Sequence, residues 1–112
     1  MTKLEVIIRP TKFEAVKEVL TELGVHGMTT ADVRGQGMQK DHNETYRGHE
    51  YYLGLMPKIK IDLVLPDDIV DDVVAAVVRA ASTGAIGDGK IFASRIDQAI
   101  RIRNQQIGAA AL

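Results

Sequence analysis

The sequence predicts a small α+β domain of the ferredoxin-like type, in which two split β–α–β units (βαββαβ) share one antiparallel sheet. Two kinds of apolar periodicity, one of period two and one of three to four residues, follow each other in the order strand, helix, strand, strand, helix, strand. Two such units within about ninety residues fit the split β–α–β arrangement. A length of 112 residues suits a single domain, residues 1–112, with a long loop between the second and third strands.

The first unit begins with a strand over residues 3–9, where apolar and charged residues alternate. A helix follows, with Thr11 as its predicted N-cap and Glu14 completing a capping box. Its apolar face comprises Phe13, Val16, Val19, Leu20 and Leu23. Gly24 should end the helix, since glycine readily adopts the left-handed conformation of a C-terminal cap. Residues 28–34 form a weakly patterned second strand.

The second unit opens with the clearest strand of the chain, residues 58–65, in which Ile59, Ile61, Leu63 and Leu65 alternate with Lys60 and Asp62. Pro66 ends this strand and opens a helix whose first turn holds two aspartates, which suit the helix dipole. The apolar stripe of this helix comprises Ile69, Val70, Val73, Val74, Val77 and Val78. A glycine-rich loop at 82–89 leads to a fourth strand over residues 90–96.

This topology leaves one face of the sheet uncovered. Right-handed crossovers place both helices on the same face, so the strands expose apolar side chains on the other. Exposed apolar patches of this kind indicate a contact surface, and we therefore expect an oligomer that packs sheet faces together. The alternative is that charged side chains such as Lys60 and Asp62 solvate the face.

Composition excludes several classes of protein. A net charge of −1 gives no general attraction to nucleic acid or to an anionic membrane. The absence of cysteine excludes disulfides and thiolate chemistry, and no apolar run is long enough to insert into a bilayer. Charges near the N-terminus are unlike a signal peptide, so we expect a cytoplasmic protein. The histidines His26, His42 and His49 are interpreted as surface residues, because no carboxylate frame for a metal surrounds them.

The segment from about 37 to 57 interrupts the regular pattern. It includes the stretch NETYRGHEYY, residues 43–52, which contains all three tyrosines of the chain. Loops of this length inside a compact domain are either functional or disordered. The segment therefore predicts a protruding loop that contacts a partner through exposed tyrosines. The alternative is a long hairpin that extends the two flanking strands.

The stretch GAIGDGK, residues 84–90, has the spacing of a phosphate-binding P-loop but is not one. Ile91 stands where that motif needs a serine or threonine, and the expected elements are helix before and strand after, the reverse of the motif. Glycine-rich backbone can nevertheless aim N–H groups at an anion, and Lys90 adds a positive charge. The alternative is a plain turn.

The stretch AIRIRN, residues 99–104, is open to two interpretations. Residues 98–103 form either a turn followed by a short strand or a short helix. A strand would place Arg101 and Arg103 on one face, where two guanidinium groups can clamp phosphates; the alternative is an edge strand whose arginines are solvated. We expect Lys58, Lys90 and the two arginines to converge near one end of the sheet. This favours a small polyanion such as a nucleotide over a long nucleic acid, since aromatic residues make up only 4% of the chain.

Two of these stretches resemble the signatures of the PII signal-transduction protein family: YRGHEY at 46–51 and TGAIGDGKIF at 83–92. The likeness extends over the whole chain, including its length, the ending IRIRN and the positions Gly35, Gly37, Gln39 and Lys58. The resemblance implies a non-enzymatic homotrimer with nucleotide clefts between subunits. It also implies that residues 37–55 form the family's T-loop, which docks onto membrane transport channels, metabolic enzymes or regulators of nitrogen metabolism. In this scheme 82–90 is the phosphate loop and 97–112 a C-terminal segment.

The resemblance implies that ATP and ADP compete for the cleft, and that 2-oxoglutarate joins Mg-ATP. Thr29 and Val64 would lie near the adenine, and the remaining positions near the phosphates. The residues assigned to the nucleotide are Thr29, Gly35, Gly37, Gln39, Val64, Gly87, Asp88, Gly89, Lys90, Arg101 and Arg103. Gln39 would also reach Mg²⁺, and Gln39 and Lys58 would meet 2-oxoglutarate. Tyr51 stands where some members are uridylylated.

Two departures from the family pattern bear on the ligands. Met38 replaces a common arginine, which should weaken ATP more than ADP, and Asp41 replaces a common glycine. An added carboxylate disfavours a dianion, so we expect weak or absent 2-oxoglutarate binding. The second interpretation is therefore a nucleotide sensor that ignores 2-oxoglutarate and regulates a transporter other than an ammonium channel. A slow ATPase, for which no general base is evident, and a trimer that binds nothing are further alternatives.

Overall fold

The computed structural model describes residues 1–36 and 55–112 and has the predicted order of elements. The strands are β1 (Thr2–Ile8), β2 (Thr29–Gly35), β3 (Met56–Leu65) and β4 (Gly89–Arg95). The helices are α1 (Phe13–Glu22) and α4 (Val70–Ala81), and three short 3₁₀ helices span Pro10–Lys12, Asp67–Ile69 and Gly108–Ala111. Each strand begins and ends within two residues of its predicted bounds.

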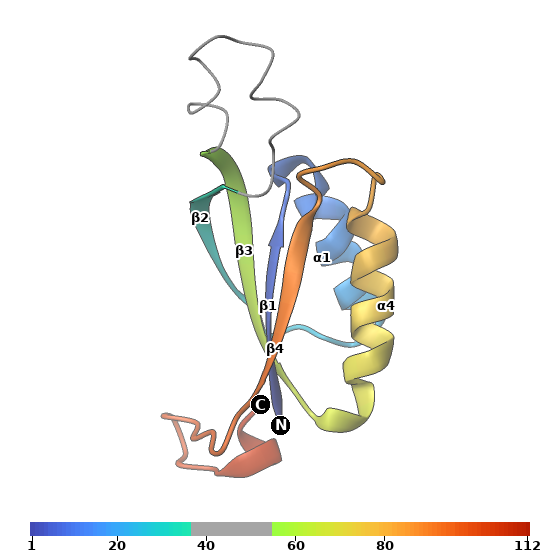
Figure 1. Cartoon of the computed structure of the whole chain (residues 1–112). Helices are drawn as coiled ribbons and strands as arrows, with labels where there is room; N and C mark the ends of the chain where they lie inside the picture. Colours follow the sequence, from blue (N-terminus) through green and yellow to red (C-terminus); the bar gives the residue numbers. More distant parts are fainter. Residues whose placement is uncertain (37–54) are drawn as a thin grey trace, which may run out of the picture.

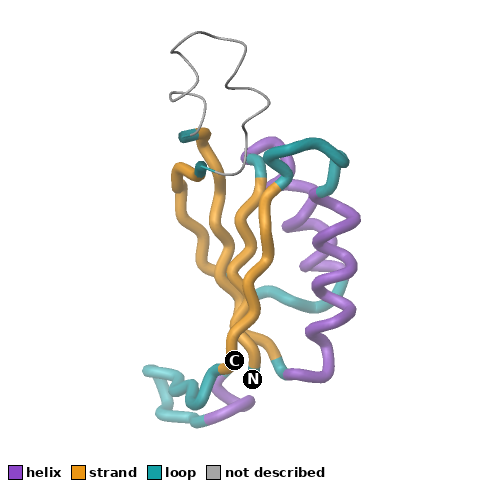
Figure 2. The backbone as a smooth tube through the Cα atoms, viewed as in Figure 1, coloured by secondary structure: helices purple, strands orange, loops and turns teal. Residues whose placement is uncertain are grey.

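The strands form one antiparallel sheet in the order β2-β3-β1-β4. Both helices pack on the same face of this sheet (Figures 1 and 2). This two-layer arrangement confirms the predicted ferredoxin-like fold. The loop 82–88 lies at the end of the sheet where β1 finishes and β4 begins, because Ile8 pairs with Gly89.

The core lies between the sheet and the helices. Alternate strand residues point to opposite faces, so one set of β1 residues is buried and the other is not. The largest fully buried side chains are Leu4, Val6, Val16, Leu20, Ile61, Leu63, Val73 and Val77. These residues are the apolar positions of the predicted strands and helices, which explains why the sequence pattern places the elements correctly.

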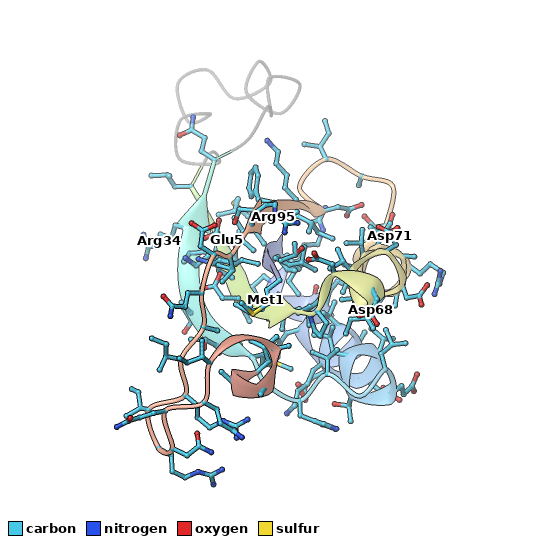
Figure 3. The ribbon with its side chains drawn as sticks, turned by 90° about the horizontal axis from the view of Figure 1, so that it is seen from below. Met1, Glu5, Arg34, Asp68, Asp71 and Arg95 are labelled. Carbon is cyan, nitrogen blue, oxygen red and sulfur yellow. The ribbon has the colours of Figure 1, made fainter. Side chains whose placement is uncertain are left out.

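As predicted, no helix of the described residues covers the second face of the sheet. Lys60 Nζ lies 3.7 Å from a Glu5 oxygen and 3.8 Å from an Asp62 oxygen, so charged side chains do solvate part of it. Phe92, which pairs with Glu5, is nevertheless 51% exposed. Viewed from below, Glu5 lies away from the helical side that carries Asp68 and Asp71 (Figure 3). The face therefore combines ion pairs with an exposed aromatic ring.

The predicted capping box at Thr11 is wrong. Thr11 lies inside the 3₁₀ turn Pro10–Lys12, and α1 begins at Phe13 without any side-chain cap. Proline has a φ suited to the first position of a helical turn, so the turn starts one residue before the proposed cap. The C-terminal prediction is confirmed, since Gly24 has φ +79° and its N–H donates to the carbonyl of Thr21 at 3.0 Å.

The segment 97–112 contains neither a strand over 99–104 nor a helix there. Ile100 forms an isolated bridge with Ile107, and the intervening chain turns back on itself. The N–H of Arg101 donates to the carbonyl of Gln106 at 2.9 Å, and Gln105 adopts φ +60°. Arg101 and Arg103 are therefore not two residues of one strand face. The segment lies at the end of the sheet opposite to the loop 82–88 (Figure 1).

Candidate functional site

The glycine-rich loop 82–88 is folded around the carboxylate of Asp88. This carboxylate accepts hydrogen bonds from the N–H of Thr83 at 2.8 Å, the N–H of Gly84 at 2.9 Å and the hydroxyl of Thr83. The Thr83 hydroxyl is the main reason that the pKa of Asp88 lies far below its usual range. Asp88 is therefore ionised at neutral pH and organises the loop from within.

Replacing Thr83 with alanine should raise the pKa of Asp88 toward the ordinary value of about 3.9, because the strongest stabilising hydrogen bond is lost. A depressed carboxyl pKa stabilises the fold above the unfolded-state pKa, and this contribution is lost as the pH falls through the folded-state pKa. In Thr83→Ala this contribution should be smaller, and its loss should be complete at a higher pH, because only the folded-state pKa has risen. NMR titration of the Asp88 carboxyl carbon measures the shift.

Thr21→Ala is the matched control, since the Thr21 hydroxyl donates to the carbonyl of Lys17 on α1 and not to Asp88. An unchanged Asp88 titration in Thr83→Ala would contradict this account of the loop.

Arg9 holds the loop from the sheet side. Its Nη2 donates to the carbonyl of Ile86 at 2.8 Å, and its Nε donates to the Asp88 carboxylate at 3.3 Å. This role was not predicted from the sequence, in which Arg9 is only the last charged residue of the expected first strand. The structure shows that Arg9 directly follows β1 and that the last residue of β1, Ile8, pairs with the first residue of β4, so strand pairing brings Arg9 beside the loop.

Lys58 reaches the same loop from β3. Its side chain is buried, with 9% exposure, and its Nζ donates to the carbonyl of Gly87. Burial lowers the pKa of this lysine, and the charge of Arg9 lowers it further, while Asp88 opposes the shift. Two cations thus approach two consecutive carbonyl groups of the loop.

Lys58 and Asp88 border a pocket of about 370 Å³. The volume is typical of a site for a small molecule. Its walls come from the loop, from β1, β3 and β4, and from the end of β2: Ile7, Gly35, Gln36, Lys58, Ala85, Ile86, Gly87, Asp88, Gly89, Lys90 and Phe92. Six residues proposed from the sequence are therefore brought together: Gly35, Lys58, Gly87, Asp88, Gly89 and Lys90.

Four other proposed residues lie away from this pocket, toward the other end of the sheet. Thr29 and Val64 lie toward the other end of the sheet, where Val64 pairs with Lys3. Arg101 and Arg103 follow β4, whose seven residues span about 20 Å. The expected convergence of both arginines with Lys58 and Lys90 within one chain is therefore wrong.

The remaining proposed residues, Gly37, Gln39 and Tyr51, lie outside the described residues, as do Met38 and Asp41. The proposed T-loop lies outside them too, apart from Leu55, so neither the open-loop nor the hairpin interpretation is decided. Within 1–36 and 55–112, no group of three or more histidine, aspartate or glutamate residues is placed to hold a metal ion.

A family model described as nitrogen regulatory protein P-II matches residues 1–106 of the chain. The chain belongs to the P-II family. The nitrogen regulatory protein P-II of Rhodobacter capsulatus is 52% identical over 112 residues, and that of Bradyrhizobium diazoefficiens is 50% identical. The nitrogen regulatory protein P-II 1 of Escherichia coli K12 is 49% identical. Each alignment covers the whole of both chains.

Membership of the P-II family confirms the resemblance to the PII signal-transduction proteins and agrees with the ferredoxin-like fold. None of the helices in the part of the chain that the structure describes is both long and apolar enough to cross a membrane.

Proposed function

We propose that this P-II protein is a homotrimeric sensor that binds ATP and ADP in clefts between subunits and regulates a target protein through residues 37–55, the T-loop. The observation that carries the proposal is the pocket beside the glycine-rich loop. There Lys58 and Lys90 flank backbone that is free of bulky side chains at Gly87 and Gly89. Such a combination of cations and accessible backbone suits a chain of phosphate groups.

The arrangement of the remaining residues supports a site shared between subunits. One end of the protomer supplies the glycine-rich pocket, and the opposite end supplies Thr29, Val64 and the two C-terminal arginines. A head-to-tail contact joins two different ends of neighbouring copies, and it forms a ring such as a trimer when its rotation closes. In such a ring each nucleotide would contact the phosphate end of one subunit and the adenine end of the next.

The position of the pocket agrees with this assembly. Ile7, Lys58, Lys90 and Phe92 line it, and the strand register places all four on the face that no helix covers. A second copy packed on that face would wall in the pocket. Removing water there would strengthen the attraction between the lysines and a phosphate.

A regulatory role is favoured over ATP hydrolysis. Among the described residues, Asp88 is the acidic side chain that lines the pocket, and its oxygens already accept hydrogen bonds from Thr83, Gly84 and Arg9. It is thus a structural anion and poorly placed to activate water. The regulatory names of the relatives support a target in nitrogen metabolism, such as a transport channel, a metabolic enzyme or a regulator. In this proposal the sensor acts in the cytoplasm.

A calorimetric titration with ATP and with ADP, each with Mg²⁺, tests the proposal. Lys90→Ala should weaken both nucleotides by about tenfold to a hundredfold, the effect of losing a charged hydrogen bond. Lys17→Ala, on the exposed side of α1, is the control and should bind as the unchanged protein does. Equal affinity in Lys90→Ala would remove Lys90 from the site, and no binding by the unchanged protein would refute the proposal.

The second candidate, an energy sensor that ignores 2-oxoglutarate, is favoured by Asp41 and by the contact of Lys58. The Lys58 ammonium already donates to the carbonyl of Gly87, so only its remaining N–H donors are available to a carboxylate. The same titration with added 2-oxoglutarate separates the candidates. Binding only in the presence of Mg-ATP indicates a sensor of carbon and energy together, whereas no binding favours the second candidate and a target outside ammonium uptake.

A further inference from the structure

Arg9 connects the end of the central strand β1 to two points of the glycine-rich loop. One branch of its guanidinium donates to the carbonyl of Ile86, and Nε donates to the carboxylate of Asp88 two residues later. The guanidinium also packs on Gly87, since a Cβ at that position would lie 3.2 Å from Nη2. A planar group with several fixed donors can hold two acceptors in one geometry, which a single ammonium cannot do.

These contacts orient consecutive peptide groups. In a trans peptide the C=O and the following N–H point in opposite directions. The Ile86 carbonyl faces Arg9 and the Gly87 carbonyl faces Lys58, so the N–H groups of Gly87 and Asp88 point away from those cations. Neither N–H has a hydrogen-bond acceptor among the described residues. Successive N–H groups of this kind form a concave site for an anion.

We propose that Arg9 is a positioning residue of this anion site: it fixes the loop so that the N–H groups of Gly87 and Asp88 are available to phosphate. This inference rests on the proposed function, in which the loop receives the phosphates of a nucleotide. Arg9 acts through the loop, because its Nη2 and Nε bond to Ile86 and Asp88 and its side chain is not part of the pocket lining.

Arg9 has a second effect through charge. Asp88 lines the pocket, and an unpaired carboxylate beside a phosphate chain would repel it. The ion pair with Arg9, 3.3 Å between Nε and Oδ1, offsets that charge while both side chains remain partly shielded from solvent. Loss of Arg9 should therefore both loosen the loop and expose the ligand to the charge of Asp88.

The test compares Arg9→Gln with the unchanged protein by amide hydrogen exchange and by calorimetric titration with ADP. We expect the amides of Thr83 and Gly84, which donate to Asp88, to exchange about tenfold faster, while amides of the core strand β1 exchange unchanged. ADP should bind about tenfold more weakly, because the loop donors are no longer pre-oriented. Arg79→Gln, on the exposed side of α4, is the matched control and should change neither quantity.

Arg9→Lys supplies a second variant that keeps the charge but has one donor group. It should restore ADP binding only in part, since an ammonium can offset Asp88 without holding the Ile86 carbonyl in place. The inference would be overturned if Arg9→Gln had the same loop-amide exchange rates and the same ADP affinity as the unchanged protein. If Arg9→Gln does not fold, the same two results in Arg9→Lys would overturn it.

The two proposals fail in different ways. If ADP does not bind the unchanged protein, the proposed function fails, yet the exchange of the Thr83 and Gly84 amides still decides whether Arg9 orders the loop. If ADP binds and Arg9→Gln behaves as the unchanged protein does, the function stands and the role of Arg9 is refuted.

Discussion

Replacing Gly89 with alanine should lower the free energy of unfolding by about 4 kcal/mol or more, an exceptional loss for one methyl group. Gly89 has φ +113°, a conformation that L side chains rarely adopt, and a Cβ there would lie 1.8 Å from the carbonyl oxygen of Ile7. That oxygen belongs to β1, which is held between β3 and β4 and cannot move aside. The added methyl group must therefore displace the start of β4 and the end of the glycine-rich loop.

Gly84→Ala is the matched control for this prediction. Gly84 also has positive φ, +84°, but nothing lies within 4 Å of a Cβ added there. Its replacement should cost only the backbone strain, about 1 to 2 kcal/mol. Urea denaturation at one protein concentration measures both variants, since stability coupled to assembly depends on concentration. Similar losses in the two variants would contradict the clash with Ile7.

The periodicity of the sequence predicted the sheet and the helices well, because burial on one face of each element leaves a regular pattern. The strand expected over 58–65 lies within β3, Met56–Leu65, and the same alternation accounts for β1. The pattern could not predict where the first helical turn begins, since Pro10 and Thr11 both suit an N-terminal position. It also failed at 99–104, where alternating isoleucine and arginine resembles a strand although the chain reverses.

The failure at 99–104 has a physical cause. The reversal is closed by the bridge between Ile100 and Ile107 and by the left-handed conformation of Gln105, which is rare for a residue other than glycine. Ile102 is 95% exposed, so no core contact imposes a strand on the segment.

The candidate site was predicted in part. Glycine spacing pointed to the loop and to Lys90, and family resemblance added Gly35 and Lys58, which the structure places around the same pocket. Arg9 could not be found from spacing, because it reaches the loop through strand pairing between residues about eighty positions apart. Arg101 and Arg103 were expected near Lys58 and Lys90, but the segment that holds them follows β4 and lies at the opposite end of the sheet.

Phe92→Lys should convert the proposed trimer into a folded monomer and remove high-affinity nucleotide binding with it. Phe92 is a large apolar side chain that is half exposed on the uncovered face, and it lines the pocket. A lysine at this position would lie opposite Glu5 on β1, so the isolated protomer gains no like-charge repulsion from that pair. Packing a second copy on the face would bury the new charge, which is unfavourable by several kcal/mol.

Light scattering after size-exclusion chromatography measures the mass, circular dichroism verifies the fold, and titration with ADP measures the site. Phe92→Leu is the control: it keeps an apolar group and should preserve both the assembly and binding. The paired readouts matter, because a site completed by a neighbouring subunit must be lost when the subunits separate. A Phe92→Lys monomer that still bound ADP tightly would place the whole site in one protomer, and an intact trimer would show that the subunits meet through another surface.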